Sequence, residues 1–175
     1  GVEQKMLYQP LEYNELILKA STYFLNQNHL FLSFKSRYFF EEINWFESRI
    51  NNQPFIKPPA LKLTLTTSSN FNKPISLNTT ISCNYRFTEA YNIWENYNNI
   101  SIYYRFNPRF RINNHAFLQY IIAIENEKNQ FGWITESDSE LAVFSRRNRN
   151  TVTNKISFNY TFNPKTYIKL IARHY

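Results

Sequence analysis

Hydrophobic and polar residues alternate with a period of two along most of this chain. Between residues 75 and 87, every second side chain but one is apolar, and the side chains between them are Ser, Asn, Thr and Arg. The same alternation runs through 61–68, 99–106 and 152–162, and it is typical of β-strands whose two faces meet different environments. Helical spacing is poor throughout, so the pattern predicts an all-β chain. The predicted strands are 14–25, 29–40, 60–70, 74–87, 97–106, 109–125, 151–162 and 165–175.

Short and long connections alternate between these strands. Asn and Pro dominate the short connections, because Asn tolerates left-handed backbone and Pro presets φ. The short connections are Asn26-Gln27-Asn28, Phe71-Asn72-Lys73, Asn107-Pro108 and Asn163-Pro164. The long ones are rich in Asn, Glu, Arg, Pro and Trp, and they lie at 41–59, 88–96 and 126–150.

Three features favour a transmembrane barrel over a soluble sandwich. Strands of about 10–13 residues, tilted by about 40°, match the thickness of a bilayer's hydrocarbon layer. The face opposite the apolar one is small, polar and often cationic, as a water-filled interior requires. Short turns at one end and long loops at the other are typical of outer-membrane barrels. We therefore expect an antiparallel up-and-down transmembrane β-barrel, with about eight strands in this chain. Aromatic residues beside the short turns would form an interfacial girdle: Tyr85, Phe87, Tyr104, Phe106, Phe110, Tyr160 and Phe162.

The same layout makes a prediction about the ends of the chain. If the short turns face the periplasm, the first strand, 14–25, runs inward and the last, 165–175, runs outward. Both ends would then lie on the extracellular side. We therefore expect residues 1–175 to be a single barrel segment, an internal piece of a longer chain with a larger barrel. A soluble β-barrel or sandwich, whose strand-end aromatics cap a core and which binds a small apolar ligand, remains the alternative.

Composition narrows the function classes. The content of Phe 16, Tyr 13 and Trp 3 against only Gly 2 excludes a disordered chain and glycine-rich dinucleotide or phosphate loops. The longest apolar runs are far below the roughly 18 residues of a membrane helix. Cys83 is the only cysteine, so we expect neither a disulfide framework nor a thiolate metal site, and we expect no cofactor. The net charge of +7 permits attraction to phosphates or anionic lipid.

Residues 40–175 resemble a known family, most specifically over 144–175. The residues that carry the resemblance are the stretch 144–154, which reads Phe-Ser-Arg-Arg-Asn-Arg-Asn-Thr-Val-Thr-Asn, the stretch 160–165, and the ending Ala172-Arg173-His174-Tyr175. They are similar to the C-terminal region of a Bacteroidetes-type family catalogued as domain of unknown function 5916, and residues 45–59 are similar to a loop of that family. The resemblance implies a large outer-membrane barrel that follows a module like a family-nine carbohydrate-binding domain. It implies no particular reaction.

The densest charge in the chain is the cluster Arg146, Arg147 and Arg149. Planar guanidinium groups suit phosphate, so the cluster is a candidate contact for lipopolysaccharide or another anionic ligand. The alternative is a solvated loop in which the arginines pair with nearby acidic residues, namely Glu136, Asp138 and Glu140.

Other basic residues fall mostly on the polar strand faces, where they would line the interior of a barrel and favour anions in an open pore. Alternatively, they would pair with residues of strands outside this chain. The candidates for interior-facing positions are Arg86, Arg105, Arg111, His115 and Lys155. A hydrolase built on His115 is conceivable, but no Ser or Asp is placed by sequence to serve as its partner.

The sequence as a whole predicts a structural, channel or surface-assembly component of a bacterial outer membrane rather than an enzyme. Its expected partners are outer-membrane lipid or lipopolysaccharide, together with other outer-membrane or surface proteins. Basic residues interleaved with aromatics superficially suit single-stranded nucleic acid. We expect no nucleic-acid partner, because the chain has no RNA-binding motif.

Overall fold

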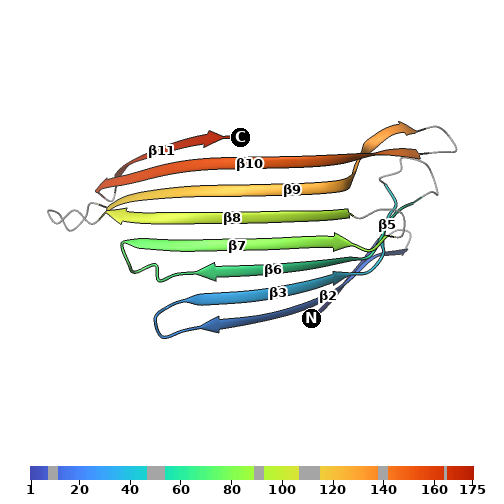
Figure 1. Ribbon diagram of the computed structural model, residues 1–175, viewed down its shortest axis with the longest axis horizontal. Helices are drawn as coiled ribbons and strands as arrows, with labels where there is room; N and C mark the ends of the chain where they lie inside the picture. The colour runs from blue at the N-terminus through green and yellow to red at the C-terminus, as the bar shows by residue number, and fades with distance from the viewer. Residues whose placement is uncertain (8–11, 47–53, 89–92, 107–114, 138–141, 164) are drawn as a thin grey trace.

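The computed structural model describes residues 1–7, 12–46, 54–88, 93–106, 115–137, 142–163 and 165–175. Nine strands form one antiparallel sheet in the order β1-β2-β3-β6-β7-β8-β9-β10-β11, and β4 and β5 form a separate hairpin (Figure 1). Their bounds are β1 Val2–Leu7, β2 Glu12–Leu25, β3 Phe31–Phe39, β4 Glu42–Asn44, β5 Phe55–Lys57, β6 Ala60–Ser68, β7 Ile75–Arg86, β8 Ile93–Phe106, β9 His115–Ser137, β10 Ala142–Asn163 and β11 Thr166–His174.

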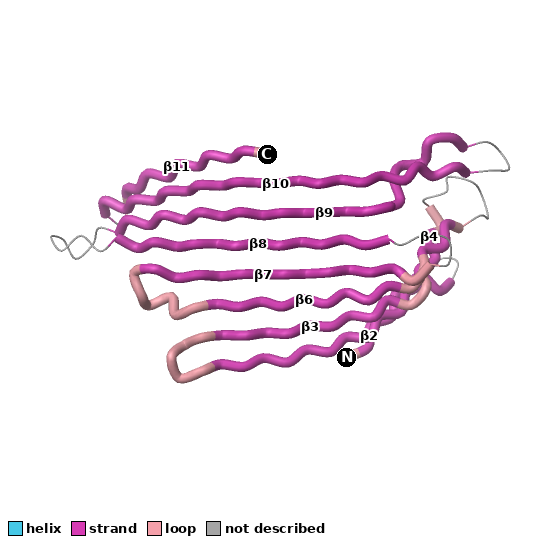
Figure 2. The backbone as a smooth tube through the Cα atoms, in the orientation of Figure 1, coloured by secondary structure: helices cyan, strands magenta, loops and turns pink. Residues whose placement is uncertain are grey.

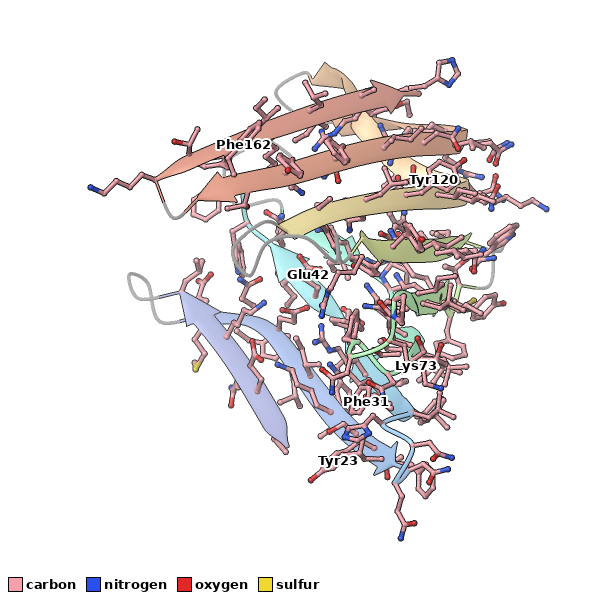
Figure 3. The ribbon with its side chains drawn as sticks, turned by 90° about the vertical axis from the view of Figure 1, so that its left-hand side faces the viewer. Tyr23, Phe31, Glu42, Lys73, Tyr120 and Phe162 are labelled. Atoms are coloured by element: carbon pink, nitrogen blue, oxygen red, sulfur yellow. The ribbon has the colours of Figure 1, made fainter. Side chains whose placement is uncertain are left out.

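The predicted all-β class and up-and-down order are confirmed, because neighbours in the sheet are neighbours in the chain except where β4 and β5 intervene. The edges of the sheet are β1 and β11, and within the described residues no pairing joins them. The sheet is therefore open. Figure 3, which views it from one end, shows that it is curved.

Connections lie at two ends of the sheet, as predicted (Figure 2). At the end we call the turn end, β2 connects to β3 and β6 to β7. The first turn is closed by the Asn26 amide, which donates to the Leu30 carbonyl at 3.0 Å, and its left-handed residue is His29, with φ of 61°. In the second, the Asn72 amide donates to Asn70 Oδ1 at 2.8 Å. At the opposite end, the loop end, β3 leads through β4 and β5 to β6, β7 leads to β8, and β9 leads to β10.

Several sequence-based boundaries are wrong. The predicted connection 126–150 is mostly strand, since β9 continues to Ser137 and β10 begins at Ala142, so that this pair projects beyond β8 at the loop end (Figure 1). Strand β1 was not predicted, and it places Val2 opposite Leu18. The chain therefore starts part-way along the sheet, not at its loop end as the layout of eight strands predicted. The predicted turns at Asn107-Pro108 and Pro164 lie outside the described residues.

The two faces of the sheet differ in burial, and the more exposed face is the apolar one. On the apolar face, side chains are exposed: Ile75 by 62%, Ile156 by 50% and Ile81 by 45%. On the polar face, small hydroxyl side chains are buried; these are Ser33, Ser76, Ser82, Ser101 and Ser157. The strand positions alternate between these faces as predicted, but burial follows the polar side. The sheet therefore curves around its polar face.

Aromatic side chains lie near both ends of the sheet. The predicted girdle is wrong in placing Tyr85 and Phe87 beside a short turn, because β7 runs from the turn end to the loop end. There Phe87 lies 5.3 Å from Tyr85 and 6.3 Å from Tyr38, measured between ring centroids. At the turn end, Tyr160 and Phe162 contact each other at 4.6 Å. Phe110 and the side chain of Phe106 lie outside the described residues.

Candidate functional site

Polar side chains, all but one of them charged, cross the polar face in a continuous row. The strand register places one residue of each strand from β2 to β10 opposite the next. The members of this row, which we call the charged row, are Lys19, Arg37, Lys62, Asn84, Glu95, Glu127 and Arg149. The row is cationic on β2, β3 and β6, acidic on β8 and β9, and cationic again on β10. The amino-acid composition alone does not reveal this separation of charges by strand.

The acidic part of the row has partners within the sheet, although Glu127 Oε2 is buried without a hydrogen bond among the described residues. Glu95 accepts hydrogen bonds from Asn84 Nδ2 at 3.3 Å and from Gln130 Nε2. Glu127 Oε1 lies 2.5 Å from Arg149 Nη2, and its Oε2 lies 3.7 Å from Arg147 Nη2. Hydrogen-bonded ion pairs of this kind are the arrangement that makes a partly buried carboxylate tolerable.

An irregularity in the β9–β10 pairing brings both arginines to Glu127. The register shifts between Arg147, which lies opposite Gln130, and Arg149, which lies opposite Glu127. The extra residue is accommodated by Asn129, whose φ of 54° is left-handed, a conformation that Asn tolerates better than most residues. The Asn129 amide donates to Asn148 Oδ1 at 2.8 Å. This is a β-bulge, and it re-aims the side chains beside it.

The arginine cluster predicted from the sequence is thus divided. Arg149 also lies 3.8 Å from Glu125, so Arg147 and Arg149 are paired with acidic residues of β9. The expected alternative named Glu136, Asp138 and Glu140 as partners; Asp138, Glu140 and the side chain of Glu136 lie outside the described residues. Arg146 is exposed and also makes an interaction.

The cationic part of the row differs from the acidic part. Lys19 pairs with Glu3 of β1. In the part of the chain that the structure describes, no carboxylate pairs with Arg37, Lys62 or the neighbouring Lys35. These three side chains line a hollow of about 270 Å³ on the polar face. Its remaining walls are Thr64, Thr80, Ser82 and Tyr97.

The interior-facing candidates are spread over the polar face. Arg86 donates from Nη1 to the Pro58 carbonyl at 3.2 Å and lines a hollow of about 200 Å³ with Lys57 and Glu95. Arg105 lies near the turn end and is exposed, and its backbone pairs with Phe117.

The other candidates lie apart from the hollows. Lys155 lies opposite Arg173 of β11. His115 begins β9, where its backbone pairs with Thr161, but its side chain lies outside the described residues, as does Arg111. No Ser or Asp is therefore assigned to His115. The pairing of Glu125 and Glu127 with arginines, and the position of Glu95, were not predicted from the sequence. The signal for the pairing is the spacing of two residues in both Glu125-x-Glu127 and Arg147-x-Arg149.

The β4–β5 hairpin lies against the polar face at the loop end. At one side, Trp45 Nε1 donates to the Tyr13 carbonyl of β2 at 3.3 Å. At the other side, the Phe55 ring stacks on Phe144 of β10 at 4.2 Å and meets Phe131 of β9 edge-on at 5.0 Å. The hairpin therefore connects β2 with β9 and β10, which are far apart in the sheet. In Figure 3, Glu42 of β4 lies on the inner side of the curve.

Neither metal ligation nor helical membrane crossing is found among the described residues. They contain no group of three His, Cys, Asp or Glu side chains placed to hold a metal ion. None of their secondary structure is a helix of the length and apolarity that would span a bilayer.

Comparisons with known proteins place the chain in one family. A family model described as "Domain of unknown function (DUF5916)" matches residues 1–175, the whole chain. No curated protein and no solved structure matches it.

Proposed function

The chain belongs to the DUF5916 family, and we propose that its sheet is part of the wall of a transmembrane β-barrel in a bacterial outer membrane. In this arrangement the apolar face meets lipid and the polar face lines a water-filled interior. The protein would serve as a channel, a scaffold or a component of a surface assembly. Lipopolysaccharide and other outer-membrane proteins are its proposed partners.

The observation that carries the proposal is the inverted burial of the two faces. Soluble monomers rarely expose a continuous apolar patch larger than a few hundred Å². Here exposed apolar side chains continue across the sheet, from Leu18 on β2 through Leu63 on β6 to Leu170 on β11, and no second layer of described residues covers them. Lipid is the environment that stabilises an apolar outer face around a polar interior.

The dimensions of the apolar face agree with a bilayer. Exposed apolar side chains extend from Ile75 to Tyr85 on β7 and from Val152 to Phe162 on β10, which is 85 − 75 = 10 and 162 − 152 = 10 positions. At about 3.3 Å per residue, each stretch is about 33 Å long. A strand tilt of about 38° reduces this to about 26 Å along the membrane normal, close to the apolar band of about 25 Å in outer-membrane barrels.

The slant of the apolar face supports such a tilt independently. On β2 the exposed apolar stretch Leu18 to Phe24 is centred on residue 21, and on β10 the stretch Val152 to Phe162 is centred on 157. Six successive strand pairings connect Ser21 of β2 with Thr151 of β10. The centre of the apolar stretch on β10, residue 157, therefore lies 157 − 151 = 6 residues away from the position level with the centre on β2. This is a shift of one residue from each strand to the next. With a rise of about 3.3 Å per residue and about 4.8 Å between strands, it corresponds to a strand tilt of about 35°.

The alternative of a soluble sheet that binds an apolar ligand has less support. The hollow of about 270 Å³ is lined by charged and hydroxyl side chains of the polar face. The hollow of about 200 Å³ is lined mainly by charged and amide side chains, with Ile93 and Phe131. A soluble sandwich would also curve around its apolar face, since that face would form the core.

The contact of the arginine cluster with lipopolysaccharide remains a proposal, and the pairing of Arg147 and Arg149 with Glu127 reduces the positive charge that is free for it.

Reconstitution tests the proposal. We expect the intact protein to be monodisperse in detergent micelles and to aggregate when detergent is removed, and we expect it to insert into phospholipid vesicles so that alkaline carbonate does not extract it. Ion conductance in a planar bilayer would then separate an open pore from a closed one. A protein that stays monodisperse without detergent would refute the membrane proposal.

A further inference from the structure

Three cations on neighbouring strands face one another across the polar face. Lys19, Arg37 and Lys62 are directly opposite in the register, and like charges in directly opposite positions destabilise a sheet. Glu3 neutralises Lys19. Arg37 and Lys62, together with Lys35, have no carboxylate partner in the described residues, although the acidic residues of β8 and β9 lie on the same face. The arrangement is therefore electrostatically unfavourable until an anion joins it.

The surroundings of these cations form a hollow, in which Lys35 and Arg37 are exposed and Lys62 is half-buried. Their hollow of about 270 Å³ carries four hydroxyl groups besides the three charges, and Thr64 Oγ1 and Ser82 Oγ lie 3.0 Å apart, which fixes both side chains. A water molecule takes about 30 Å³, so the hollow has room for a phosphate or carboxylate group and several waters. A planar guanidinium and two ammonium groups are the donors that bind such groups best.

A second, adjoining hollow contains an acceptor that lacks a donor. This hollow, of about 190 Å³, shares Lys62 and Ser82 with the first and includes Asn84. The carboxylates of Glu95, Glu125 and Glu127 also line it, so a group that donates a hydrogen bond suits it better than an anionic oxygen. Asn84 Oδ1 is buried and has no hydrogen-bond partner, while Asn84 Nδ2 is engaged by Glu95. A buried acceptor is costly unless a donor reaches it, so a hydroxyl-bearing ligand or a water would be bound here.

We propose that Lys35, Arg37 and Lys62 form a binding site for a small soluble oxyanion, a phosphate or carboxylate group, with Asn84 accepting a hydrogen bond from a hydroxyl of the same ligand. This site adds a ligand to the proposed function. It rests on that function in one respect, because the polar face must be open to water. The ligand is soluble rather than a lipid headgroup, because the site lies on the face opposite the exposed apolar side chains.

Titration of the intact protein in zwitterionic micelles with inorganic phosphate, followed by calorimetry or ³¹P line broadening, tests the site. We expect one phosphate per chain, with affinity that falls as salt rises. The double variant Lys35→Gln, Lys62→Gln should bind at least about tenfold more weakly, as expected when charge-assisted hydrogen bonds are lost. The matched control Lys155→Gln, Lys169→Gln removes the same charge from the same face, on β10 and β11, and should bind phosphate as the parent does.

Each outcome decides one point. Absence of phosphate binding, or equal weakening in the control, would overturn the site. A parallel arm with lipopolysaccharide in place of phosphate separates the two sources of the oxyanion: binding of the lipid alone would also overturn the proposal of a soluble ligand. Vesicle insertion is measured on the same preparations, so that a protein that binds phosphate but does not insert would refute the proposed function and leave the site intact. Circular dichroism confirms that each variant is folded.

Discussion

A lysine introduced into the middle of the apolar face tests whether that face meets lipid. Ile156 lies one position from the centre of the exposed stretch Val152 to Phe162. If the stretch crosses a bilayer, a lysine at 156 is near the midplane, where it costs about 2–4 kcal/mol in the free energy of unfolding. On a surface exposed to water, the same substitution would change stability by no more than about 0.5 kcal/mol.

Val152 is the matched control on the same strand and face. Its side chain is 49% exposed and that of Ile156 is 50% exposed, so the two lose similar packing when they are replaced. Four residues separate them, which is about 13 Å along the strand and about 10 Å along the membrane normal at the proposed tilt. Val152→Lys is thus near the edge of the apolar band and should cost about 0–1 kcal/mol. We expect the two variants to differ by about 2–3 kcal/mol.

The assay is equilibrium unfolding by guanidinium of the protein folded in phospholipid vesicles, with the free energy taken from the midpoint and slope. Equal costs for Ile156→Lys and Val152→Lys would refute the reasoning in either of two ways. Two small costs would mean that the face meets water. Two large costs would mean that protein covers the face, because the cost of burying a lysine against protein does not depend on depth in a membrane.

Three further predictions concern the loop end. Phe55→Ala removes the stacking on Phe144 and should release the β4–β5 hairpin, seen as faster protease cleavage between residues 41 and 59; an unchanged rate would contradict the hairpin's anchoring. Arg149→Ala should destabilise the sheet by about 1 kcal/mol because the pair is partly exposed, and a double-mutant cycle with Glu127→Gln should assign most of that loss to the pair; additive effects would argue against it. Asn129→Gly should be nearly neutral, whereas Asn129→Val should cost about 1–2 kcal/mol because φ is positive there; similar stability of the two variants would show that the backbone conformation is different.

The sequence was sufficient to predict strands wherever one face is apolar, because a side-chain period of two is the direct consequence of an extended backbone. It failed where both faces are polar. Residues 126–130 and 145–150 contain Asn, Glu, Lys and Arg in place of alternating apolar residues, and they are strands because ion pairs such as Glu127 with Arg149 link them across the bulge. Strand β1 was missed for the same reason: Glu3 and Lys5 pair with Lys19 and Glu15 of β2.

The candidate site could be predicted only in part. Alternation alone puts Lys35, Arg37 and Lys62 on polar strand faces, but it cannot bring them together, because that depends on the register between β3 and β6. The β4–β5 hairpin was beyond prediction: its strands have three residues each, and their position depends on contacts of Trp45 and Phe55 with strands distant in the sequence. Alternation also could not tell which face is concave, and that is the feature on which the membrane proposal depends.

Cys83, the only cysteine, allows the most direct test of that proposal, because it is exposed on the apolar face of β7. A nitroxide attached to Cys83 in proteoliposomes reports collisions with dissolved oxygen and with a water-soluble nickel complex. We predict frequent collisions with oxygen and few with nickel, as in hydrocarbon, and the opposite for a label on the polar face at residue 80 in the variant Cys83→Ser, Thr80→Cys. Frequent nickel collisions at Cys83 would place the apolar face in water, few collisions with either would place it against protein, and both results would contradict a wall exposed to lipid.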